Sequence, residues 1–206
     1  YDVVYENAQA RERTQILMDI ANAEGGIVVG TGDLSELALG FATYNGDHMS
    51  MYGVNASVPK TLMREIINYE ARRLSDVSGG ALSRVLYDVV KTPVSPELLP
   101  TDGEAVTQQT EDIVGPYVLH DFFLYHTVKY GKEPKEILKL AKAAFSGEYK
   151  EEYIKGYLEI FTRRFFTQQF KRSAMPDGPR VSEISLSPRG AWSMPSDAAS
   201  DIFRKI

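Results

Sequence analysis

The sequence predicts an α/β fold, in which a parallel sheet with flanking helices is partly represented and a helix-rich C-terminal half follows. Residues 27–29 form an uninterrupted β-branched run bounded by glycines, which is typical of a strand buried on both faces of a parallel sheet. Apolar residues at helical spacing dominate the chain after residue 116. Because one strand is too few for a sheet, we expect further strands to precede residue 1.

A helix is expected first, then the strand, a short helix and a loop. The helix spans Asn7 to about Ala23, because Ile16, Leu17 and other apolar residues fall near one face and two glycines stop it. After the strand, a short helix is expected at 35–40 and a polar, glycine-bearing loop at 43–48. This order is typical of an α/β unit.

The remaining elements are mostly helices. They are expected at Pro59 to about Leu74, Ala81–Val90, Tyr117–Tyr130, Glu133–Ala144 and Glu151–Lys171. Residues 92–116 are rich in Pro, Thr, Asp and Glu and predict a long loop. The tail at 173–206 carries four prolines and little periodicity, so we expect it to wrap over other elements. Aromatic residues at helical spacing, among them Phe161 and Phe165, are interpreted as core.

Composition excludes several classes of protein. The chain has 206 residues, 43% of them hydrophobic and 25% charged, which are ordinary globular values. A net charge of -5 argues against broad binding to nucleic acid or to an anionic membrane, and we expect neither partner. The chain has no cysteine, so a disulfide or thiolate site is excluded; this suits a cytoplasmic location. No run approaches the roughly 20 apolar residues needed to span a bilayer.

The segment that follows the strand carries the chemistry. A Gly-Thr-Gly turn at 30–32 would let the backbone approach a phosphate, because ligands bind beyond the carboxyl ends of parallel strands. Asp33 and Glu36 are candidate oxygen ligands for Mg²⁺, and Lys60 is a candidate phosphate-binding charge. Alternatively, Asp33 caps a helix and Lys60 is a solvated lysine at a helix start. The residues alone predict a nucleotide or phosphate pocket and name no substrate.

A family resemblance names the substrate. The run GTGDLSELALGFATYNGDHMSMYGVNASVPKT at 30–61 resembles the signature of the glutamine-dependent NAD⁺ synthetases. YENAQARER at 5–13, TPVSPELL at 92–99, and FKR, PDGP and SPRG between 170 and 190 are similar to other segments of that family, in the same order. The resemblance covers nearly the whole chain. It implies that 1–206 is the C-terminal portion of a Rossmann-like ligase domain in the ATP pyrophosphatase superfamily.

The resemblance implies a reaction and its partners. Family members activate the nicotinate carboxylate of deamido-NAD⁺ with ATP and Mg²⁺ and then let ammonia, released from glutamine by an amidase domain, displace AMP. A carboxylate is a poor electrophile, and the charge that builds on the phosphates needs Mg²⁺ and lysines. The resemblance also implies a homo-oligomer. The expected rivals are another ATP pyrophosphatase amidotransferase and a non-catalytic helical assembly module.

The resemblance also implies roles for individual residues. Asp47 and Lys60 are expected to be catalytic, and Glu36 to hold the metal; alternatively, Asp47 caps the loop after Asn-Gly. The histidines His48, His120 and His126 are interpreted as structural or surface residues. Deamido-NAD⁺ is expected to contact Asn7, Arg11, Glu36, Phe41, Ala42, Thr43, Tyr44 and Lys171, and ATP to contact Thr31, Lys60 and Ser95.

One expected motif is missing from its place. The family grips ATP pyrophosphate with a Ser-Gly-Gly-x-Asp-Ser loop after its first strand. The similar run SGGALS at 78–83 follows no buried strand, has Leu82 where the aspartate belongs, and comes after the signature segment. We interpret it as a flexible link between two helices. The true loop and the amidase domain are expected upstream of Tyr1, and the 206 residues alone are expected to be inactive.

Overall fold

The computed structural model describes residues 2–93 and 114–201. The described elements are α1 (Val3–Glu24), β1 (Val29–Gly30), α2 (Leu34–Leu39), β2 (Tyr52–Gly53), α3 (Lys60–Arg73), the 3₁₀ helix η1 (Val77–Gly80), α4 (Ala81–Lys91), α6 (Tyr117–Tyr130), α7 (Pro134–Ala144), α8 (Glu151–Thr167) and α9 (Gln169–Ser173). The predicted loop at 92–116 lies largely outside these residues, and so does Ser95.

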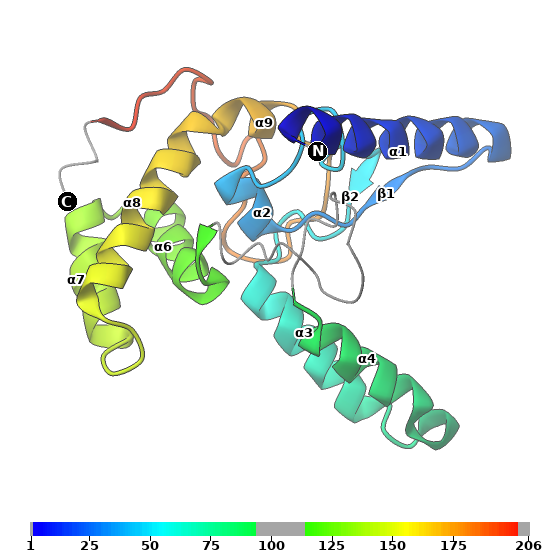
Figure 1. Cartoon of the computed structure of the whole chain (residues 1–206), viewed down its shortest axis with the longest axis horizontal. Helices are drawn as coiled ribbons and strands as arrows, with labels where there is room; N and C mark the ends of the chain where they lie inside the picture. The colour runs from blue at the N-terminus through cyan, green and yellow to red at the C-terminus, as the bar shows by residue number, and fades with distance from the viewer. Residues whose placement is uncertain (1, 94–113, 202–206) are drawn as a thin grey trace.

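The helices form one packed body from which two arms extend. In Figure 1, α6, α7 and α8 pack together at one end of the molecule, and α2 lies between them and the two strands. The α3–α4 hairpin projects from the body, and α1 extends away from it in another direction. The short helix α2 therefore sits where the body, the strands and the hairpin meet.

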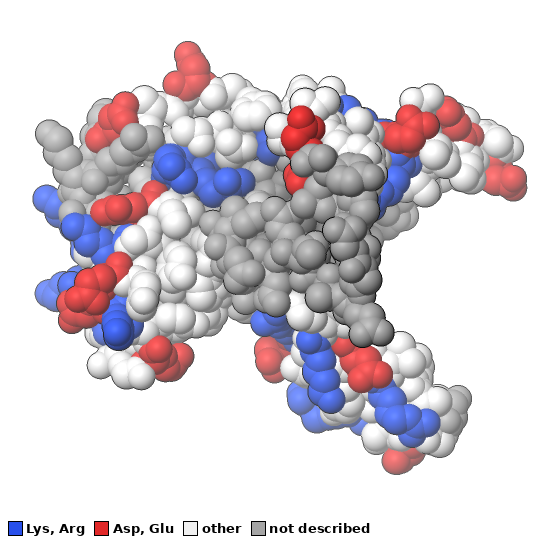
Figure 2. All heavy atoms as spheres, in the orientation of Figure 1, with Lys and Arg blue, Asp and Glu red and all other residues white. Residues whose placement is uncertain are grey.

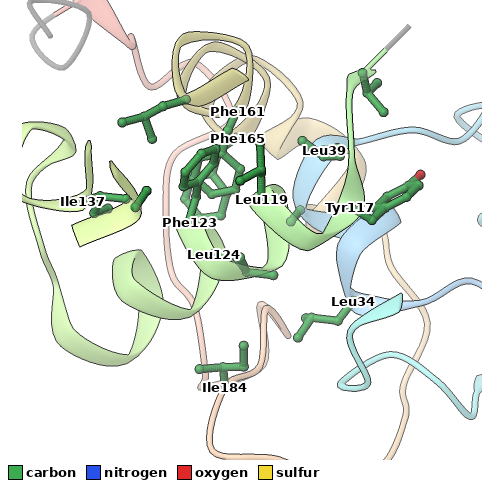
Figure 3. Packing of buried hydrophobic residues seen from close by; sticks show 14 of the residues in the cluster. Leu34, Leu39, Tyr117, Leu119, Phe123, Leu124, Ile137, Phe161, Phe165 and Ile184 are labelled. Carbon is green, nitrogen blue, oxygen red and sulfur yellow. The ribbon is translucent and has the colours of Figure 1, made fainter. Parts of the chain in front are cut away.

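The core joins α2 to the C-terminal half. Phe123 of α6 and Phe161 and Phe165 of α8 pack at its centre, and Leu34 and Leu39 of α2 belong to the same cluster (Figure 3). Each of these side chains is nearly inaccessible to solvent, and burial stabilises each by about 1.5–3 kcal/mol. Phe161 and Phe165 are therefore core residues, as predicted, whereas Tyr153 of the same helix is 57% exposed and the interpretation of it as core is wrong.

The sheet is parallel, as predicted, but more exposed than expected. Within the described residues it has two strands, with Val29 opposite Tyr52 and Gly30 opposite Gly53. The prediction of a strand buried on both faces is wrong for this structure, because Ile27 is 64% exposed and Val29 49% exposed. The second strand was not predicted, since two residues are too few to show an alternating pattern.

Helix boundaries follow their caps. α1 begins at Val3, earlier than the predicted Asn7, because the Asp2 carboxylate accepts hydrogen bonds from the amides of Val4 and Tyr5. Pro59 is the N-cap of α3 instead of its first residue. The predicted helix at 151–171 is two helices, α8 and α9, which meet at Gln168.

The link at 78–83 contains more helix than expected. Residues 77–80 form η1 and residue 81 begins α4, so only the first half of the segment connects the two helices of the hairpin. No helix in the described parts of the chain is long and apolar enough to cross a membrane. On the face shown in Figure 2, basic and acidic side chains of the described residues are interspersed.

Candidate active site

The site is built on α2, a helix of six residues that local propensity alone would not keep folded. The Asp33 carboxylate accepts a hydrogen bond from the Glu36 amide at 2.9 Å, and the Glu36 carboxylate accepts one from the Asp33 amide at 3.1 Å. This reciprocal capping box satisfies two amides at the start of the helix. Asp33 is therefore the N-cap that one reading of the sequence predicted.

Lys60, the first residue of α3, binds the two carboxylates at the N-terminal end of α2. Its ammonium lies 2.6 Å from Asp33 Oδ2 and 2.9 Å from Glu36 Oε1, and its side chain is 14% exposed. The reading of Lys60 as a solvated lysine is therefore wrong. Burial alone would lower the pKa of Lys60, but attraction to Asp33 and Glu36 outweighs burial and raises it. Lys60 is charged at neutral pH.

Asp33 is the titratable member of this cluster. Burial, together with the negative charge of Glu36, raises the pKa of Asp33 to about 7, although Lys60 pulls it down. Two carboxylates beside one ammonium leave an excess negative charge, which a proton on Asp33 can relieve. The cluster can therefore take up or release a proton near neutral pH.

A cavity of about 180 Å³ opens beside this cluster at the ends of the two strands. The end of β1 lies close to the segment that precedes β2, since a Cβ atom at Gly30 would collide with the side chain of Ser50. Four predicted residues line it: Thr31, Glu36, Ala42 and Asp47. The remaining lining residues are Gly30, Gly32, Leu37, His48, Ser50, Gly53, Ala56, Met175 and Pro176.

The loop at 43–48 forms one wall of the cavity and is tied to α1. Asp47 Oδ1 accepts a hydrogen bond from the Thr43 amide at 2.7 Å, which is the loop-capping contact expected of an aspartate after Asn-Gly. Thr43 Oγ1 donates to Asn7 Oδ1 at 2.9 Å, and Arg11 Nε donates to the Tyr44 carbonyl at 3.2 Å. The structure thus brings Asn7 and Arg11 to this loop. Thr43 and Tyr44 do not line the cavity itself.

Three cations hold the other end of α2. Lys171 donates to the carbonyls of Gly40 and Ala42 at 2.7 and 2.5 Å, and Arg164 donates to the Leu39 carbonyl at 2.8 Å. The buried Arg172 donates to the carbonyl of Ala38 at 2.9 Å. Lys171 therefore faces backbone carbonyls here. Phe41 is partly buried against the core, with the Arg164 guanidinium 5.6 Å from its ring centre.

A magnesium ion would find two carboxylates in the cavity, those of Glu36 and Asp47, of which Glu36 is the expected ligand. Glu36 lines it, but one of its oxygens accepts from the Asp33 amide and the other pairs with Lys60. The described residues contain no group of three acidic or histidine side chains that could hold a metal alone. Magnesium accepts one or two carboxylates when phosphate oxygens and water complete its shell, so Glu36 fits such an ion only together with a bound phosphate.

His48 belongs to the cavity wall, a role that the sequence did not indicate. It is buried, and its Nδ1 lies 3.0 Å from the Thr43 carbonyl; because a carbonyl only accepts, Nδ1 carries the hydrogen. Burial lowers the pKa of His48, so the ring is neutral at pH 7. His120 is a buried structural residue whose Nε2 bonds to the Val114 carbonyl at 2.5 Å, and His126 packs on Phe122.

Sequence reasoning missed Asp121, Arg164 and Arg172. All three make hydrogen bonds to residues of α2 or its C-terminal end from more than eighty positions away in the chain. A buried charge is rare unless it is paired, but burial of these residues has no signature in the sequence. The two arginines bond to backbone carbonyls, which any residue carries.

Glycines and two carboxylates line a cavity at the ends of two parallel strands, which is the place where α/β proteins bind their ligands. The chain belongs to the NAD synthase family, whose model matches residues 1–146. This assignment agrees with the resemblance found in the signature segment.

Individual relatives carry the same family name. A glutamine-dependent NAD(+) synthetase from Mycobacterium leprae is 44% identical over 222 residues, a match that covers 98% of this chain and 32% of the relative. The Mycobacterium tuberculosis H37Rv protein is 45% identical with the same coverage. The crystal structure of the Cytophaga hutchinsonii enzyme superposes with a TM-score of 0.72 at 19% identity, covering 97% of this chain and 29% of that one, and shows a shared fold. The chain thus spans about a third of the length of these relatives.

Proposed function

We propose that the protein to which this chain belongs makes NAD⁺ from deamido-NAD⁺, with ATP and with ammonia released from glutamine. A nicotinate carboxylate oxygen attacks the α-phosphorus of ATP, and the bond to pyrophosphate breaks. Ammonia then attacks the carbonyl carbon of the adenylate, loses a proton, and expels AMP. The family assignment and the curated relatives support this reaction. Because the chain spans 32% of such a relative, the amidase activity would belong to other parts of the protein.

The observation that carries the proposal is the cluster of Lys60, Asp33 and Glu36 at the cavity. The Lys60 ammonium pairs with both carboxylates, and it adjoins the cavity through one of them, Glu36, which is a lining residue while Lys60 is not. An ammonium has three donors, so one can reach a phosphate oxygen without breaking either ion pair. Such a fixed charge stabilises negative charge that develops on ATP during adenylation.

For the other residues we propose the roles that the family resemblance implies. The glycine turn and Thr31 would hold phosphate through backbone and hydroxyl groups. Glu36 would hold Mg²⁺, which supplies charge neutralisation at the phosphates when it is bound. Asp47 lines the cavity and would accept the proton that ammonia or ammonium loses. Asn7, Arg11, Phe41, Ala42, Thr43, Tyr44 and Lys171 are proposed to form the dinucleotide side, and Ser95 the ATP side.

Substitution of the cluster tests the proposal. Lys60→Ala and Glu36→Ala, made in the protein at its natural length, should each lower ammonia-dependent NAD⁺ formation by on the order of 100- to 1,000-fold, since each removes charge at the reacting phosphates. NAD⁺ would be measured directly from deamido-NAD⁺, ATP, Mg²⁺ and ammonium, so the amidase step is bypassed.

Another lysine–glutamate pair provides a matched control. Lys142 and Glu151 also form an ion pair, at 2.5 Å, but join α7 to the start of α8 away from the cavity. Lys142→Ala and Glu151→Ala should leave the rate unchanged. If Lys60→Ala and Glu36→Ala turned over as fast as these controls, the cluster would have no part in the reaction. A homo-oligomeric, cytoplasmic enzyme is part of the same proposal.

A further inference from the structure

Two side chains of α6 lie directly against the Lys60 cluster and have no role in the reaction described above. Tyr117 and Asp121 are four residues apart, which places them on one face of the helix, one turn from each other. Both are buried, with exposures of 2% and 8%. The Lys60 ammonium lies 5.0 Å from the centre of the Tyr117 ring, a distance at which a cation is attracted to an aromatic face.

Asp121 binds the first turns of the two helices that form the cluster. On the α2 side, its Oδ1 accepts a short hydrogen bond from the Ser35 hydroxyl. On the α3 side, its Oδ2 accepts hydrogen bonds from the Thr61 amide at 3.0 Å and the Thr61 hydroxyl at 2.6 Å. One carboxylate thus fastens α2 to α3.

The same carboxylate reaches the backbone of Lys60 through one intermediate. Ser35 Oγ donates to Asp121 and accepts a hydrogen bond from the Lys60 amide at 2.8 Å. Ser35 is almost fully buried, at 1% exposure, so water cannot replace these contacts. Lys60 is therefore fixed at two points: its amide by Ser35, and its ammonium by the Tyr117 ring and the carboxylates of α2.

From this geometry we infer that Asp121 is a positioning residue, which sets the place of the Lys60 ammonium by docking the first turns of α2 and α3 onto α6. Helix α6 is suited to this because Leu119, Phe123 and Leu124 anchor it in the core. A buried carboxylate adds little to stability compared with an apolar side chain of similar size. Its hydrogen bonds do, however, specify one relative placement of two helix starts, and that placement is what Lys60 needs.

Lysine labelling tests the placement without relying on the reaction. The protein would be treated briefly with an acetylating reagent, and acetylation of Lys60 and Lys171 would be measured by peptide mass spectrometry. Lys171 is a half-buried lysine held by carbonyls at the other end of α2, so it reports general unfolding. In Asp121→Asn and Ser35→Ala, labelling of Lys60 should rise roughly fivefold, as expected when one hydrogen bond is lost. Labelling of Lys171 should stay as in the parent protein.

A destabilised control separates placement from stability. Leu124→Ala removes a buried side chain from the same helix and should raise the labelling of both lysines together. If Asp121→Asn behaved like Leu124→Ala, or left Lys60 unchanged, the positioning role would be wrong. Ser35→Ala keeps the carboxylate and gives a second reading if Asp121→Asn fails to fold.

The effect of Asp121→Asn on catalysis rests on the proposed function, and it is measured separately from the labelling of Lys60. Asp121→Asn should lower kcat for NAD⁺ formation on the order of 10- to 100-fold, because Lys60 would be displaced from the phosphates. KM for deamido-NAD⁺ should hardly change. In a Lys60→Ala background the same substitution should have no further effect on kcat, whereas a general structural defect would add to it. If Asp121→Asn raised the labelling of Lys60 but left kcat unchanged, Asp121 would position Lys60 as inferred. The proposed role of Lys60 in the reaction would then be wrong.

Discussion

The two ends of α2 are held by opposite kinds of chemistry. At the N-terminal end, Asp33, Glu36 and Lys60 form a cluster of ionised side chains beside a cavity. At the C-terminal end, Arg172 and Lys171 donate to backbone carbonyls, and no carboxylate pairs with either among the described residues. Both arrangements satisfy the groups that a helix end leaves unpaired. Only the first contains a side chain, Asp33, whose pKa lies near neutral pH.

This difference predicts how each end responds to damage. If a cation is removed from the N-terminal end, a carboxylate can take up a proton and lose its charge. If a cation is removed from the C-terminal end, the buried carbonyls stay unpaired, because they cannot be protonated at ordinary pH. An unpaired buried polar group costs about 1–3 kcal/mol. We therefore expect the C-terminal end to govern stability and the N-terminal end to be free for function.

Arg172→Met should give the largest loss of stability. It removes a fully buried guanidinium that donates to Ala38, Leu37 and Phe165 carbonyls, and leaves them unpaired. Burial lowers the pKa of Arg172 to about 9, which still leaves it charged at pH 7. We expect the free energy of unfolding to fall by about 4 kcal/mol, measured by urea denaturation.

Arg73→Met is the control for Arg172→Met. Arg73 is an exposed arginine at the end of α3 whose ion pair with Glu70 faces solvent. Its loss should hardly change the denaturation midpoint. Equal effects of the two substitutions would contradict the view that the C-terminal end of α2 is a stability determinant.

Gly40→Ala should damage the same end through the backbone. Gly40 ends α2 with φ of 60°, where an L-residue is strained, and an added Cβ atom would collide with the side chain of Gln168. Gly25 ends α1 with nearly the same φ of 64° but has open space around it. We expect losses of about 3 kcal/mol for Gly40→Ala and about 1 kcal/mol for Gly25→Ala in thermal or urea unfolding. Matching losses would show that packing against Gln168 is unimportant.

Acidification should lower the free energy of unfolding through His120, a buried residue of α6. Burial lowers the pKa of His120 to about 4, from an ordinary value of 6.5, so the unfolded chain binds a proton here that the folded chain does not. The stability that this histidine contributes is therefore complete above pH 6.5 and is lost as pH falls toward 4. Between pH 7 and 4.5 the loss should be about 2 kcal/mol.

The contribution of His120 is obtained by comparing the pH dependence of unfolding of the parent protein with that of His120→Gln. His120→Gln keeps a donor for the Val114 carbonyl but does not titrate, so other groups contribute equally to both curves. Urea unfolding of the parent protein should weaken more steeply with acid than that of the variant. Parallel curves would mean that His120 does not titrate in this range.

The sequence could predict most of α2 and its N-terminal end, because that chemistry is local. Asp33 and Glu36 are three residues apart in a capping pattern, and Lys60 follows a proline at a helix start. The pairing of Lys60 with both carboxylates was not predictable, since it depends on where α3 docks. The exposure of the strand at Val29 was not predicted for a related reason. Burial depends on neighbouring elements, and the sequence of a strand does not reveal them.

The C-terminal end could not be predicted from the sequence. Arg164 and Arg172 lie 125 and 134 positions from the carbonyls that they bind. Lys171 was assigned to the substrate by resemblance, and its carbonyl partners follow only from the fold. Asp121 is 86 positions from Ser35 and sits in an ordinary apolar helix pattern, so its burial is a property of helix packing.

Lys60→Met should have the smallest effect on stability, and an effect that depends on pH. The pKa of Asp33 is already raised to about 7, above its ordinary 3.8, so its folded form binds a proton that the unfolded form releases. Such a group favours folding at low pH, and this contribution is lost as pH rises through the folded pKa.

Without Lys60 the pKa of Asp33 should rise further. At pH 6 a protonated Asp33 carries no charge and Glu36, the other carboxylate that loses its partner, is partly exposed to solvent, so Lys60→Met should cost about 1 kcal/mol. At pH 8.5 the carboxylates must share the site without a cation, and the loss measured by urea denaturation should be larger. A loss that is the same at both pH values would mean that the N-terminal end cannot neutralise itself, and the contrast between the two ends of α2 would rest on position alone.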